Sequence, residues 1–271
     1  MEWETGPPLS SSGSTGSAHL IRATEFFQGS APTVALIVNN CIDLNLLKNV
    51  CNNAAYILCA DGGANRLHDG LQGEVIPDAV VGDLDSLRSD VRSYLIEKGA
   101  KIVSVMNQDK HDFDKSLEYL YKNGVNTLAS DQKKEDATQD TGKTQDLRVV
   151  VLGGLGGRFD QDMANINSLF KWSQYFTSLT ILSRENKIQL VGAGTTELMP
   201  DLNFEGPTCG IIPVGGGAEQ VSTTGLKWNL KGDEIKFGGL ISTSNEITGK
   251  SVTIKTTHPV LWTTSFAAER L

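Results

Sequence analysis

The feature that most constrains the fold of this 271-residue chain is a regular alternation of short apolar runs with amphipathic segments. Between residues 33 and 184, strand patterns such as TVALIVNN and LRVVVLGG alternate with helical patterns such as FDKSLEYLYKNG. Parallel strands need a crossover connection, which is usually a helix. The order therefore predicts a mainly parallel α/β sheet with helices on both faces.

After Arg184 the pattern changes to short alternating runs, such as CGIIPVG and SVTIKTT, separated by glycine, asparagine and proline. This pattern is typical of an all-β sandwich or barrel. We therefore expect an α/β domain over residues 31–184 and a β-sandwich domain over residues 185–271. Residues 1–30 are rich in Ser, Gly and Pro, which predicts a disordered tail. Residues 124–146 lack periodicity, which indicates a polar insertion between a helix and a strand.

Charge and hydropathy limit the classes of partner. The chain has 24 Lys and Arg against 32 Asp and Glu, a net charge of −8, which argues against a large nucleic-acid interface. It has no apolar run of the ~18 residues that a membrane span needs. The N-terminus lacks a basic stretch followed by an apolar core, and the cysteines form no CxxC pair, so we expect a cytoplasmic protein.

Polar clusters directly follow predicted strands at DGGAN, GDLDS, NQDKHDFDK and GGLGGRFDQ. In open parallel sheets, ligands bind beyond the carboxyl ends of the strands. These clusters therefore indicate one site at one edge of the sheet rather than unrelated turns.

The GDLDS cluster places Asp83 and Asp85 one residue apart, so they would point to the same face if the chain stayed extended. Carboxylates that close repel each other unless a cation lies between them. Together with Asp61 and Asp112 they form an oxygen-rich set that suits Mg²⁺. Each acid taken alone has an alternative interpretation as a turn residue or a helix cap.

The GGLGGRFDQ cluster is a candidate phosphate-binding loop. Glycines let backbone N–H groups approach phosphate oxygens, and the helix that follows adds positive partial charge. The loop matches neither the Walker pattern nor a strict dinucleotide fingerprint, but Arg158 within it can grip a phosphate. Lys115 lies three residues after Asp112 and would share its helix face, which suits a nucleotide–Mg²⁺ complex. A solvated lysine is the alternative for Lys115 taken alone.

In the second half of the chain, Trp228 is flanked by polar residues. A tryptophan in such surroundings can stack on a flat, cationic heteroaromatic ring. From its spacing alone, a core tryptophan of the sandwich is the simpler interpretation.

The motifs CADGGANRL, PDAVVGDLDS, QDxxDFxK, LGGLGGRFDQ, IPVG, TTGLKWNL and STSN occur in the order seen in eukaryotic thiamin pyrophosphokinases. The chain resembles this family from about residue 33 to Trp262, apart from residues 124–146. The resemblance implies an α/β catalytic domain and a C-terminal β-sandwich domain, assembled as a homodimer. It also implies transfer of a pyrophosphoryl group from ATP to the thiamin hydroxyl, giving thiamin diphosphate and AMP.

The resemblance also implies site residues. Asp83, Asp85 and Asp112 would be the Mg²⁺ carboxylates, with Asp61 as a supporting acid. The phosphates would be held by Lys115, Arg158 and the loop of Gly153, Gly154, Gly156 and Gly157, with Asp160 facing the same centre. Further ligand contacts are expected at Gly62, Gly63, Asn65, Gln161 and Ser242. Thiamin would lie in a cleft between subunits, with Trp228, Ser244 and Asn245 from one chain and Gln108 from the other.

The chain departs from the family pattern at Asn107, where an acid is common, and at His111, where threonine is common. The phosphate contacts and the pH dependence near His111 are therefore open. No covalent nucleophile is expected, and Asp112 and Asp160 are both candidates for accepting the hydroxyl proton. Two other functions also remain open. DLD is a DxD pattern of the kind that sugar-nucleotide transferases use, and a non-catalytic thiamin or nucleotide sensor would keep the same fold.

Overall fold

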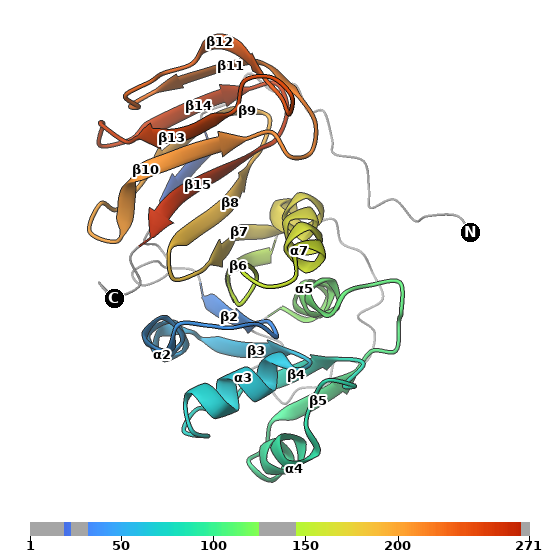
Figure 1. The fold of residues 1–271 in the computed structure, drawn as a ribbon. Helices are drawn as coiled ribbons and strands as arrows, with labels where there is room; N and C mark the ends of the chain where they lie inside the picture. The colour runs from blue at the N-terminus through green and yellow to red at the C-terminus, as the bar shows by residue number, and fades with distance from the viewer. Residues whose placement is uncertain (1–18, 23–31, 125–144, 267–271) are drawn as a thin grey trace.

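The structure is a computed structural model that describes residues 32–124 and 145–266, together with the backbone of residues 19–22. A ten-stranded sheet runs through the molecule in the order β13-β10-β15-β8-β7-β6-β2-β3-β4-β5 (Figure 1). Its strands in chain order are β2 (Thr33–Ile37), β3 (Tyr56–Ala60), β4 (Ala79–Gly82), β5 (Lys101–Ser104), β6 (Gln145–Leu152), β7 (Phe176–Leu182), β8 (Asn186–Val191), β10 (Glu205–Ile212), β13 (Ser242–Glu246) and β15 (Val260–Phe266).

The half of this sheet from β7 to β5 is parallel, as the sequence predicts. The chain proceeds outward from β2 through β3 and β4 to β5, then returns to the other side of β2 as β6. Strand order thus reverses between β2 and β6, and ligands of open α/β sheets bind at such a reversal, beyond the carboxyl ends of the strands. The loops that follow β2 and β6 lie at this point.

Helices cover both faces of the parallel half, as expected (Figure 1). One face carries α2 (Leu44–Asn53), α3 (Gly63–Gly70) and α4 (Ser89–Glu97), and the other carries α5 (Asp112–Asn123) and α7 (Phe159–Trp172). Side chains of β2 alternate between the faces: Ala35 packs into the first core and Val34 into the second.

The other half of the ten-stranded sheet is antiparallel, from β7 through β8, β15 and β10 to β13. It packs against a second sheet of order β1-β9-β14-β11-β12. That sheet contains β1 (His19–Arg22), β9 (Gly194–Met199), β11 (Ala218–Thr224), β12 (Lys231–Ile235) and β14 (Val252–Thr256). A core that includes Trp262 fills the space between the sheets. The predicted fold class, an α/β layer followed by a β-sandwich, is confirmed.

The predicted tail and insertion lie largely outside the described residues. Within the tail, β1 pairs in parallel with β9. In the part of the chain that the structure describes, no helix has both the length and the apolar character to cross a membrane.

Candidate active site

The carboxyl ends of β3 and β4 bring together an acid cluster, which we define as Asp61, Asp83 and Asp85. Each contributes a carboxylate oxygen, and these oxygens all lie within 4.8 Å of one another. The chain does not stay extended between Asp83 and Asp85, because β4 ends at Gly82 and Leu84 has a φ of 68°. The convergence of these acids is thus confirmed, but a turn with a left-handed residue produces it, not strand geometry.

Lys115 links this cluster to Asp112. Its Nζ atom lies 3.0 Å from Oδ2 of Asp83 and 2.8 Å from Oδ1 of Asp112. Lys115 is only 3% exposed, so the alternative of a solvated surface lysine is wrong. Asp112 begins α5, and a separation of three residues puts its carboxylate and Lys115 on one side of the first turn. The ammonium group of Lys115 thus neutralises part of the charge of Asp83 and Asp112, and Asp85 has no ion-pair partner among the described residues.

Burial and neighbouring charges shift the pKa values of three residues in the site. The hydrogen bond from Lys115 lowers the pKa of Asp83. Burial alone would lower the pKa of Lys115, but its hydrogen bonds to Asp112 and Asp83 outweigh that effect and the pKa is raised. Burial raises the pKa of Asp61 to about 6, and the neighbouring carboxylates of Asp112, Asp85 and Asp83 contribute to the rise.

The acid cluster fits a divalent cation. Oδ1 of Asp61 is buried and, among the described residues, has no hydrogen-bond partner, while Oδ2 accepts from the backbone N–H of Ser86 at 3.2 Å. A buried carboxylate oxygen without a donor is unfavourable unless an ion completes its environment. Hard oxygen donors that carry excess negative charge are the ligands Mg²⁺ selects.

Glycines allow the acid-bearing segments to approach closely. A Cβ atom on Gly63 would lie 2.1 Å from the backbone oxygen of Ile37, and one on Gly62 would lie 2.4 Å from Nδ2 of Asn39. A Cβ atom on Gly82 would lie 2.7 Å from the Cβ of Asp61. Gly62 and Gly63, predicted as ligand contacts, thus also let α3 begin directly against the end of β2.

The glycine loop, residues 153–158, follows β6 and packs against the segment after β2. Gly153 has a φ of 76°, and a Cβ atom there would lie 2.6 Å from the backbone oxygen of Val38. The side-chain amide of Asn40 donates to the backbone oxygen of Leu155 at 3.1 Å. The loop therefore lies beyond the strand ends at the point where strand order reverses. Sequence reasoning missed Asn40, although the NN pair after the first strand is a polar cluster like the others.

The helix after this loop projects beyond the sheet. Asn165 is buried and donates to the backbone oxygen of Gly154 at 2.9 Å, so the strand ends lie level with the second turn of α7. Residues 156–161, including Gln161, are exposed. Arg158 and Asp160 pair with each other at the start of the helix, with a 3.1 Å contact from Nε to Oδ1. Arg158 must exchange this partner if it is to bind a phosphate.

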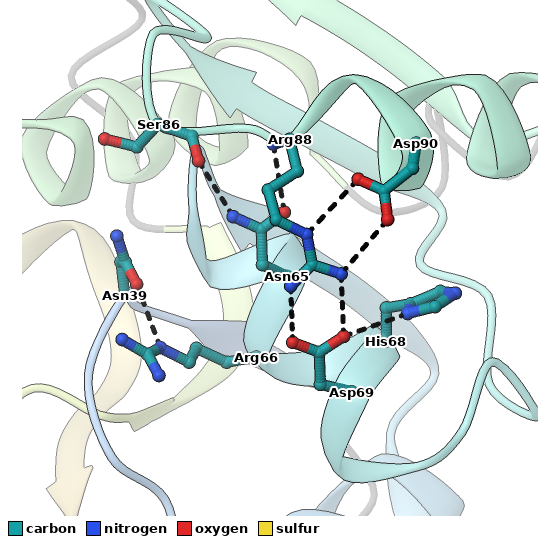
Figure 2. A network of polar contacts seen from close by, with 8 residues as sticks. All are labelled: Asn39, Asn65, Arg66, His68, Asp69, Ser86, Arg88 and Asp90. Carbon is teal, nitrogen blue, oxygen red and sulfur yellow. Dashed lines mark hydrogen bonds and ion pairs between the residues drawn. The ribbon is translucent and has the colours of Figure 1, made fainter.

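Asn65, in α3, binds the turn that contains Asp83 and Asp85 (Figure 2). Its Nδ2 donates to the backbone oxygen of Ser86 at 2.8 Å, and its Oδ1 accepts from the backbone N–H of Arg88 at 3.1 Å. The guanidinium of Arg88 in turn donates to both oxygens of Asp69, at 2.6 and 2.8 Å. These bonds lower the pKa of Asp69 to about 2. The amide of Asn65, predicted as a ligand contact, is occupied by this internal role.

Trp228 lies away from the sandwich core with 58% of its surface exposed, so its interpretation as a core tryptophan is wrong. Trp262, which is 1% exposed, occupies the core instead. Lys227 lies over the Trp228 ring, with Nζ 4.8 Å from the centroid. The exposed face of an indole held at a sheet edge is available for stacking on a ligand.

The STSN segment supports this tryptophan. Asn245 is 4% exposed; it accepts from the backbone N–H of Trp228 at 3.2 Å and donates to its backbone oxygen at 2.9 Å. Nδ2 of Asn245 also contacts the hydroxyl of Ser242, which is buried. Ser244 is exposed, with a φ of 53°. Of the predicted contacts in this segment, Ser244 faces solvent while Asn245 and Ser242 hold the backbone beneath Trp228. Gln108, predicted to contact thiamin from the other subunit, is exposed in the turn before α5.

Fold and site together define a two-part α/β protein: the strand ends of its parallel layer carry acids, a buried lysine and a glycine loop, and the layer continues into a β-sandwich. The family model described as "Thiamin pyrophosphokinase, catalytic domain" matches residues 47–182, and "Thiamin pyrophosphokinase, vitamin B1 binding domain" matches residues 195–261. The chain belongs to the thiamin pyrophosphokinase family.

Individual relatives agree with this assignment. The chain is 35% identical to thiamine pyrophosphokinase 1 of Arabidopsis thaliana, over 79% of each chain. It is 31% identical to thiamin pyrophosphokinase 1 of Caenorhabditis elegans, over 80% of this chain and 82% of the relative. The crystal structure of yeast thiamin pyrophosphokinase superposes with a TM-score of 0.79 at 25% identity, covering 93% of this chain and 92% of that one.

Proposed function

We propose that this protein transfers the pyrophosphoryl group of ATP to the hydroxyl of thiamin, producing thiamin diphosphate and AMP. The observation that carries the proposal is the acid cluster joined to Lys115 at the strand ends, in a chain of this family. We assign catalysis to residues 31–184 and thiamin binding to residues 185–271. We further propose a cytoplasmic homodimer with the thiamin site between subunits.

Asp83, Asp85 and Asp112 would hold Mg²⁺, with Asp61 as a supporting acid; Asp83 and Asp85 belong to the acid cluster with Asp61, and Asp112 is joined to it through Lys115. An Mg²⁺ ion held there would supply positive charge that offsets the charge of the phosphate oxygens and favours attack at the β-phosphorus. Lys115 lies on the same acids and stabilises the charge that develops as AMP leaves.

The glycine loop and Arg158 would hold the remaining phosphate oxygens, through backbone N–H groups and a guanidinium. Asp160 would be released from Arg158 when phosphate takes its place. It then joins Asp112 as a candidate for accepting the proton of the thiamin hydroxyl.

The first test is direct assay of the chain with ATP, Mg²⁺ and thiamin. We expect AMP and thiamin diphosphate to appear in equal amounts, and addition of EDTA to abolish both. A sugar-nucleotide transferase using the DLD segment would instead release a nucleoside diphosphate from a nucleotide sugar. A non-catalytic sensor would bind thiamin or nucleotide without forming AMP. Absence of AMP in the presence of all three components would overturn the proposal.

Replacing Trp228 with alanine is expected to weaken thiamin binding roughly tenfold while leaving ATP affinity unchanged, because a stacked ring contributes about 1–3 kcal/mol. Isothermal titration with each ligand measures both affinities. Phe237→Ala is the matched control, since Phe237 is also an exposed aromatic residue, at 62%. Equal losses for thiamin and ATP would indicate that Trp228 has a folding role instead.

A further inference from the structure

Asp114 is a buried carboxylate to which the proposed chemistry assigns no role. It is 3% exposed and lies in the first turn of α5, between Phe113 and Lys115. Its Oδ1 accepts from the hydroxyl of Ser168 at 2.6 Å and from Nε1 of Trp172 at 3.0 Å. Its Oδ2 accepts from Nζ of Lys171 at 2.7 Å. All of these donors belong to α7, so Asp114 fastens one helix to the other.

The hydroxyl of Ser168 has a choice of acceptors. It lies 2.6 Å from Asp114 and 3.1 Å from the backbone oxygen of Ala164 within its own helix. A hydroxyl donates a single proton, and a charged acceptor at the shorter distance is favoured. The Ser168 hydroxyl therefore donates to Asp114 of the neighbouring helix and not to the backbone of its own helix.

The first turn of α5 has different partners on its two sides. Lys115 and Asp112 face the loop after β4, where Lys115 contacts Asp83. Adjacent helical residues point about 100° apart, so Asp114 faces another direction, toward α7. Figure 1 shows α5 and α7 side by side on the same face of the sheet. This turn is thus a bridge between the acid cluster and α7.

On the α7 side of this bridge, the helix contacts the glycine loop. Ser168 lies one turn beyond Asn165, which holds the backbone of Gly154, and Arg158 lies at the N-terminal end of the same helix. A rotation or slide of α7 against α5 would therefore move the loop and Arg158 relative to Lys115 and Asp112. Because α7 projects beyond the strand ends, a small tilt at Ser168 produces a larger displacement at Arg158.

We propose that Asp114 is a positioning residue, which fixes α7 against α5 and so keeps the glycine loop and Arg158 in register with the acid cluster and Lys115. The proposal rests on the pyrophosphokinase function proposed above. It assigns to Asp114 no contact with substrate. A misplacement of reacting groups by about 1 Å can lower a rate about a hundredfold, so a fastening between phosphate-holding elements is expected to affect turnover.

The test compares Asp114→Asn with a matched control elsewhere in the protein. The asparagine keeps the acceptor for Ser168 and Trp172 but turns an N–H donor toward the ammonium of Lys171. Glu205→Gln makes the same chemical change at another buried carboxylate, which accepts from Lys187 at 3.0 Å and from Thr264 at 2.8 Å in the sandwich. Both variants are expected to lower the thermal unfolding temperature. Only Asp114→Asn is expected to lower kcat, by about tenfold, with the KM for thiamin unchanged.

A second-site change provides the rescue. In Asp114→Asn with Lys171→Gln, the asparagine N–H can donate to the glutamine oxygen, which restores the link without charge. We expect kcat to return to within about threefold of wild type. If Asp114→Asn does not fold, Ser168→Ala removes one of the hydrogen bonds between Asp114 and α7 and is likewise expected to lower kcat.

Hydrogen–deuterium exchange gives a readout that does not depend on turnover. Peptides covering residues 153–162 are expected to exchange faster in Asp114→Asn and at the wild-type rate in Glu205→Gln. A folded Asp114→Asn protein with wild-type kcat and wild-type exchange in this segment would overturn the proposal. If the wild type itself formed no AMP, the proposed function would fall, and the exchange rates would still decide whether Asp114 fixes the loop.

Discussion

Replacing Asp83 with asparagine is expected to lower the rate of AMP formation at least about a thousandfold, because the change removes one negative charge from the proposed Mg²⁺ site. Metal-assisted stabilisation of phosphate charge is worth several kcal/mol, and about 4 kcal/mol corresponds to a thousandfold. The asparagine keeps the size of the side chain and can still accept from Lys115, so the fold is expected to persist. Steady-state kinetics over a range of Mg²⁺ concentrations measures the effect.

Asp90→Asn is the control for this loss. Asp90 lies seven positions further along the chain, and its side chain is 70% exposed and paired with Arg88. Its replacement therefore removes the same charge, but outside the acid cluster. We expect it to retain nearly full activity and an unchanged requirement for Mg²⁺. If Asp83→Asn turned over at the wild-type rate, the metal role of the cluster would be refuted.

Replacing Gly63 with alanine is expected to destabilise the protein by about 3 kcal/mol, which is at the upper end of the usual cost of overpacking. The added Cβ atom would lie 2.1 Å from the backbone oxygen of Ile37, and neither backbone has a flexible end that can move aside. Relief requires α3 to shift away from β2, and Asp61 precedes α3 by two residues. Activity is therefore expected to fall with stability.

Urea denaturation followed by circular dichroism measures this change in the free energy of unfolding. Gly192→Ala is the matched control, because a Cβ atom there would meet nothing within 4 Å. We expect that variant to unfold within about 0.5 kcal/mol of the wild type. Similar stability for the two alanine variants would show that α3 does not pack against β2 as closely as the structure places it.

The parallel layer was predictable because local patterns specify it. Apolar runs, helical periodicity and the position of polar clusters after strands are properties of contiguous residues, and the parallel topology places those clusters at one edge. The face of α5 that contains Phe113, Leu117 and Leu120 is buried as its spacing predicts. The contact between Lys115 and Asp112 likewise follows from their separation of three residues on that helix.

The features that escaped prediction depend on contacts between distant segments. The left-handed conformation of Leu84 depends on how its turn packs, and nothing in the GDLDS motif specifies it. Whether Trp228 packs into the sandwich depends on where its turn lies relative to the sheets, and Trp262 fills the core in its place. Asp114 contacts residues more than fifty positions away, and its place in a short acidic motif resembles that of a capping residue.

The ten-stranded sheet has a consequence for any attempt to divide the protein. The boundary expected between residues 184 and 185 falls in the turn between β7 and β8, which are hydrogen-bonded neighbours. A fragment that ends near residue 184 would leave β7 with a row of unpaired backbone N–H and C=O groups at a new sheet border. Such a border is a template for pairing with other chains and promotes aggregation. The matched segments 47–182 and 195–261 both contribute strands to this one sheet, so we expect that replacing either with a foreign domain also requires a strand that pairs with the one left behind.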